Sequence, residues 1–159
     1  MSTGWLLALL FDLVCAAICA FAIIRGGKPE RRGAAVNLLA VGATAALRSL
    51  DSRHLVPADY GVFAIDACVA GGFFWLGATT VRFWPIWAAG FAVADLFMSI
   101  CGALLPRVSL FAYHTGLGIY AYLALGALAL GTIRLVPGTE PHNRHGSRRS
   151  WIKHLQETS

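Results

Sequence analysis

The chain is divided into apolar stretches of about twenty residues, and each stretch carries at most one Asp, Glu, Lys, Arg or His side chain. Only 13% of its 159 residues are charged, whereas a soluble domain has about 25%. At a rise of about 1.5 Å per residue, such a stretch crosses a hydrocarbon core of about 30 Å as a helix. The sequence therefore predicts an all-α, polytopic membrane helix bundle. Five transmembrane helices are expected, at about 4–24, 34–50, 60–80, 84–105 and 109–133, followed by a basic tail over 135–159.

The second stretch differs from the others because it is short and rich in alanine. The glycines and the proline of the preceding segment, Arg25 to Gly33, predict a loop there. A helix over 34–50 then spans only about 25 Å. Local thinning of the bilayer, snorkelling of Arg48 to the interface, or burial of this helix inside the bundle would each accommodate that length.

The basic residues are distributed unequally between the two sides that five spans define. Ten of the thirteen lie on the side of the 25–33 loop, the Arg82 turn and the tail, and three lie on the other side. Cytoplasmic loops are enriched in lysine and arginine, so the N-terminus is expected outside and the tail in the cytoplasm. The first stretch has no basic residue before it and contains Asp12, so it is expected to remain as a span rather than to be cleaved as a signal peptide.

Aromatic residues lie near the expected ends of several spans, where rings with a polar tip prefer the membrane interface. The expected anchors at the membrane surface are Trp5, Tyr60, Trp84, Trp87 and Trp151. The run from Arg82 to Phe91 (RFWPIWAAGF) resembles a segment of small, uncharacterised bacterial inner-membrane proteins. The resemblance implies a multi-pass protein of the bacterial inner membrane and brings no activity with it.

One polar side chain from each span falls in the outer half of the expected bilayer, when depth is counted from the outer end of the span. The five members of this candidate intramembrane polar layer are Asp12, Arg48, Asp66, Asp95 and His114. Charged groups are costly in lipid, so these side chains are expected to face the bundle interior and to find partners there. Three interpretations remain open: a network that fixes helix register, a proton or cation path or small-ligand site, and a metal or cofactor site.

The chain contains no motif that names a reaction. A nucleophile elbow, a phosphate-binding loop and a zinc-protease motif are all missing from the sequence, so no enzyme, metal or cofactor is predicted. The four cysteines lie within apolar stretches and form no CxxC pair, so free thiols are expected. Apart from Arg48, the basic residues lie in loops and tail, which favours contact with anionic lipid over binding of nucleic acid.

These features favour a small integral membrane protein that works as an accessory or assembly subunit of a membrane complex, or as a homo-oligomer. The alternative is a proton-coupled or cation transporter that uses the Asp and His residues of the polar layer. A membrane enzyme acting on lipid or quinone ranks below both.

Overall fold

The computed structural model describes residues 3–50, 60–104 and 110–135, together with Ser147, Arg148, Ile152 and Gln156. The described chain is all-α, as the sequence predicts, and holds five helices. They are α1 (Thr3–Arg25), α2 (Lys28–Leu50), α3 (Tyr60–Thr79), α4 (Trp84–Leu104) and α5 (Leu110–Ile133). The other element in the described part is an isolated antiparallel bridge between Thr80 and Ser147.

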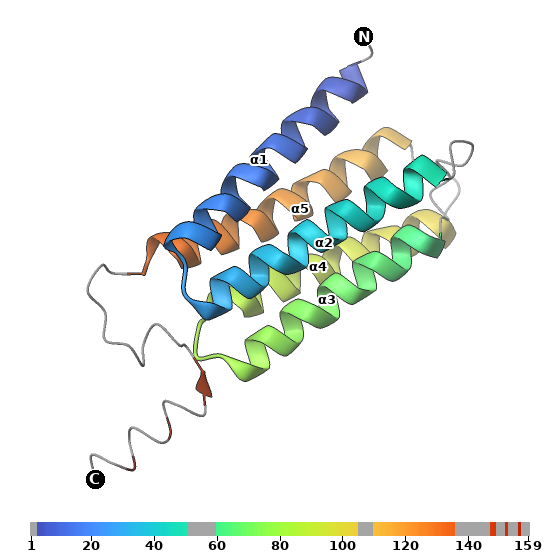
Figure 1. The fold of residues 1–159 in the computed structure, drawn as a ribbon. Helices are drawn as coiled ribbons and strands as arrows, with labels where there is room; N and C mark the ends of the chain where they lie inside the picture. The colour runs from blue at the N-terminus through green and yellow to red at the C-terminus, as the bar shows by residue number, and fades with distance from the viewer. Residues whose placement is uncertain are drawn as a thin grey trace.

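Consecutive helices run in opposite directions and form one bundle, with α1 along one side of that bundle (Figure 1). Helix α4 packs between α3 and α5, while α1 packs against α2 and α5. Because the number of helices is odd, the start of α1 and the end of α5 lie at opposite ends of the bundle. The end that holds the α1–α2 and α3–α4 connections is called the basic end here. It carries Arg25, Lys28, Arg31, Arg32, Arg82 and Arg134.

Helix α2 begins at Lys28 rather than near Ala34, so the loop predicted over 25–33 is largely helical. Pro29 lies in the first turn, where backbone N–H groups have no partner within the helix and a missing N–H is tolerated. Glu30 stabilises the start, because its Oε2 accepts a hydrogen bond of 3.0 Å from the backbone N–H of Gly27. At 23 residues, α2 extends over about 34 Å and is not the short helix that the sequence predicts.

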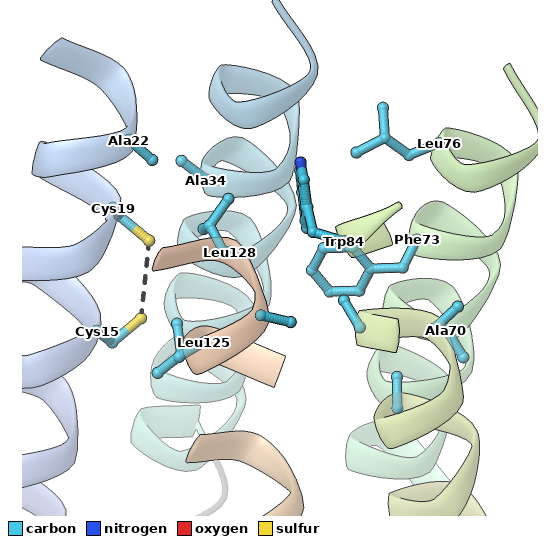
Figure 2. Close-up of a cluster of buried hydrophobic side chains, with 14 residues drawn as sticks. Cys15, Cys19, Ala22, Ala34, Ala70, Phe73, Leu76, Trp84, Leu125 and Leu128 are labelled. Carbon is cyan, nitrogen blue, oxygen red and sulfur yellow. Dashed lines mark hydrogen bonds between the residues drawn. The ribbon is translucent and has the colours of Figure 1, made fainter. Parts of the chain in front are cut away.

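Small side chains fill much of the bundle interior, and large apolar ones cover much of its outside. Figure 2 shows the buried cluster, in which alanines and cysteines surround Phe73, Leu76, Trp84, Leu125 and Leu128. On the outside, Leu39, Phe74 and Leu104 are each 70% or more exposed. Small residues allow helix backbones to approach closely in lipid, and an apolar exterior of this extent is unusual for a soluble monomer.

Two helical segments of the described chain are long and apolar enough to cross a membrane, Gly61–Thr79 and Trp84–Cys101. The segment Gly118–Ile133 is also apolar but shorter. Length and composition thus identify α3 and α4 as candidate membrane spans, which indicates association with a membrane.

Candidate functional site

Asp66 of α3 and Asp95 of α4 lie at similar heights on two helices that pack against each other. Both side chains are half-buried, and they lie close enough for their charges to interact. Their heights follow from the packing of the two helices, since a Cβ added to Gly77 would lie 3.1 Å from Cγ1 of Ile86. Eleven residues separate Gly77 from Asp66 and nine separate Ile86 from Asp95, so the two carboxylates differ by only about 3 Å along the bundle.

Oδ1 of Asp95 and Nδ2 of Asn37 on α2 are polar atoms of the described helices that are buried without a hydrogen-bond partner. A buried polar group without a partner costs about 1–3 kcal/mol, and buried groups in native proteins are nearly always satisfied. Asp95 therefore retains the capacity to accept a hydrogen bond from a proton-bearing group, a water molecule or a bound ligand.

Of the remaining members of the predicted polar layer, Asp12 is the one whose side chain is described. Asp12 lies on α1 with its side chain exposed. It differs from the expectation that every member faces the bundle interior, because Phe11, rather than Asp12, is the side chain at this level of α1 that packs against the buried cluster. The side chains of Arg48 and His114 lie outside the described ones, so the layer as a whole remains a prediction.

A second polar cluster, which the sequence analysis does not identify, lies at the basic end. Glu30 is completely buried, and its Oε1 accepts a hydrogen bond of 3.0 Å from the indole Nε1–H of Trp84. Arg82 approaches the same oxygen, with its Nε at 3.8 Å. Together with the Gly27 contact, these interactions join the start of α2 to the start of α4. The sequence contains one signal for this cluster: Glu30 is the lone acidic residue of a basic segment and lies three positions after Gly27. That spacing is typical of a capped helix N-terminus.

Trp84 is therefore not the membrane-surface anchor that its position predicts. Its side chain is only 7% exposed, and its ring contacts Phe73 edge-on at 6.2 Å between centroids. Two glycines leave room for the ring, since a Cβ on Gly33 or Gly131 would collide with it. Trp87 is 55% exposed and remains suited to the interface. The side chains of Trp5, Tyr60 and Trp151 lie outside the described ones.

The cysteines are free, as the sequence predicts. Cys15 and Cys19 lie one turn apart with their Sγ atoms separated by 4.0 Å, shown by the dashed line in Figure 2. A disulfide bond requires about 2.05 Å. Among the described residues, no group of three or more His, Cys, Asp or Glu side chains is arranged to hold a metal ion.

No family model matches the chain, and no curated protein and no solved structure matches it either. Its function must therefore be argued from its own residues.

Proposed function

We propose that the chain is a five-span protein of the bacterial inner membrane that works as an accessory or assembly subunit, or as a homo-oligomer. The apolar exterior and the small-residue interior support a bundle that lipid surrounds. The basic residues gathered at one end support an orientation with that end in the cytoplasm.

The observation that carries the subunit role is the exposed carboxylate of Asp12 on α1. Its neighbours Leu9, Leu10 and Leu13 are 51–63% exposed. A charged residue at the centre of a span costs roughly 2.5–3.5 kcal/mol when it faces lipid. A membrane helix from another subunit or another copy, with a hydrogen-bond donor at the same depth, would remove that cost and cover the leucines.

Purification of the intact protein from its native membrane in a mild detergent tests this role. We expect a stoichiometric second subunit or an oligomer of defined mass. Asp12→Asn should keep the assembly, because an amide still forms hydrogen bonds, whereas Asp12→Leu should weaken it. A lone protomer with the wild-type sequence, or equal assembly with both variants, would refute the subunit role.

The alternative role is a proton-coupled or cation transporter, and the Asp66–Asp95 pair favours it. The buried Oδ1 of Asp95 without a partner is suited to taking up and releasing a proton. His114 would continue such a path in the predicted layer.

Asp95→Asn separates the transporter from a purely structural layer. An amide cannot carry the proton, so a transporter should lose pH-dependent flux in liposomes and keep a folded bundle. If the pair is structural, the same variant should lower the thermal stability in detergent, and the wild-type protein should pass no protons.

A further inference from the structure

An apolar groove runs between α2 and α3 from the basic end toward the middle of the bundle. It consists of two adjoining cavities of about 360 Å³ and about 400 Å³. Both are lined by Val36 and Leu39, so they form one continuous depression, called the α2–α3 groove here.

The groove exists because small residues line it where larger side chains would fill the space. Ala40 and Ala43 contribute from α2, and Ala64 and Cys68 from α3. Gly72 also leaves space, since a Cβ added to it would lie 3.5 Å from Cγ1 and Cγ2 of Val36, which is ordinary van der Waals contact. Most of the groove therefore offers apolar surface to whatever lies in it.

The charged group of the groove lies at its basic end. Arg32 lines the first cavity, and its guanidinium carbon is 5.8 Å from the ring centroid of Trp75, which lines the same cavity. Lys28 precedes Arg32 by one helical turn and is also exposed. Like charges four residues apart on a helix repel each other. No carboxylate among the described residues forms an ion pair with Arg32.

The length of the groove matches one leaflet of a bilayer. From Arg32 to Ala43 the groove follows eleven residues of α2, or about 16 Å. Half of a hydrocarbon core of about 30 Å is about 15 Å. The Arg32 guanidinium, held over the Trp75 ring at the interface, fits the phosphate of a phospholipid. The apolar groove, one leaflet deep, fits an acyl chain of the same molecule.

We propose that the α2–α3 groove binds one anionic phospholipid of the leaflet at the basic end. An acyl chain lies along the groove, and the phosphate accepts hydrogen bonds from Arg32 with Lys28 beside it. Basic pockets between membrane helices on the cytoplasmic side recognise anionic headgroups by this chemistry. The inference rests on the chain spanning a membrane and is independent of its role as a subunit or a transporter.

Native mass spectrometry of the full chain in detergent, with added phosphatidylglycerol or phosphatidylcholine, tests the headgroup contact. We expect retention of phosphatidylglycerol over phosphatidylcholine. Arg32→Gln should weaken the phosphatidylglycerol complex about fivefold, the equivalent of one basic residue at an anionic surface. Arg31→Gln is the matched control, because Arg31 is exposed at the same depth but does not line the groove, and it should bind as the wild type does.

Labelling of Cys68 in the wild-type chain tests the acyl chain without any substitution. Cys68 is exposed and lines the second of the two cavities, so bound phosphatidylglycerol should slow its reaction with a membrane-permeable maleimide.

A larger side chain in the groove tests the same contact by substitution. Ala43 lines the second cavity, so Ala43→Phe should abolish lipid retention by filling the groove. Ala45→Phe, on another face of α2, should not.

Three results would overturn the proposal. Equal retention of the two lipids would show that no basic group selects the headgroup, and equal losses from Arg31→Gln and Arg32→Gln would show a diffuse basic surface. Equal protection of Cys68 by glycerol phosphate, which has no acyl chains, would show a headgroup site alone. A failed proposal here leaves the subunit role standing, because that role depends on Asp12 and α1 at a different place on the bundle.

Discussion

At the scale of single residues, Glu30 is the side chain whose environment depends most on the fold. Its two carboxylate oxygens accept hydrogen bonds from the Gly27 backbone and the Trp84 indole, each of 3.0 Å. A buried charge is tolerated only where it is paired and hydrogen-bonded. Glu30 meets that condition, and it thereby fixes the start of α2 against the start of α4.

Substitution of Glu30 should reveal how much these two contacts contribute to stability. Glu30→Ala leaves the buried Trp84 indole and the partly buried Gly27 N–H without an acceptor, at roughly 1–3 kcal/mol in the free energy of unfolding for the buried donor and less for the other. Glu30→Gln keeps one acceptor oxygen and should lose less. Unfolding by a denaturing detergent in mixed micelles measures both, and Trp84→Phe, which removes one donor alone, is the reference. Equal and negligible losses from all three variants would contradict this account.

At the scale of helices, the Trp84 ring of α4 packs against both α2 and α5. Gly33 on α2 and Gly131 on α5 have no Cβ, and this gives the ring its space. Phe73 of α3 packs edge-on against the same ring.

A single added methyl group tests this packing. Gly131→Ala places a Cβ against the Trp84 ring, and overpacking of this kind costs about 1–3 kcal/mol in the free energy of unfolding. Gly118→Ala is the matched control on the same helix, because a Cβ there meets nothing within 4 Å. The control should be neutral or slightly stabilising, since alanine favours a helix more than glycine does. Thermal unfolding in detergent compares the two, and equal effects would refute the close approach.

At the scale of the whole molecule, the arrangement of the five helices separates the chain termini. The start of α1 lies at the end of the bundle opposite the end of α5 (Figure 1). The basic residues at the connections mark one end as the end expected in the cytoplasm.

Reporter fusions test this orientation. A reporter after Ser159 should report the cytoplasm, and one before Met1 should report the outside, because five spans place the termini on opposite sides. A reporter between α3 and α4, after Arg82, should agree with the C-terminal one. Finding both termini on one side would eliminate the five-span arrangement.

Part of this structure follows from local composition, and part depends on contacts between residues that are distant in the sequence. Apolar length alone predicts the helices, because a backbone in lipid must satisfy its hydrogen bonds within each span. The positions of α1, α3, α4 and α5 follow the apolar stretches closely. The start of α2 does not follow its apolar stretch. Gly27 and Pro29 predict a loop, but the Glu30 side chain accepts a hydrogen bond from the Gly27 N–H and the helix begins at Lys28.

The sequence by itself determined the helical class, the helix count and the asymmetry of charge, because these depend on residue type and spacing. Only the tertiary structure decided which polar side chains meet. Depth can be counted along a helix, but the direction of a side chain around it depends on how the helices pack. Asp66 and Asp95 were therefore expected at similar depths and are found within range of each other's charge, whereas Asp12, also expected in that layer, lies exposed. Trp84 likewise turns inward to Glu30, because Gly33 and Gly131, far from it in the chain, leave its ring a place in the core.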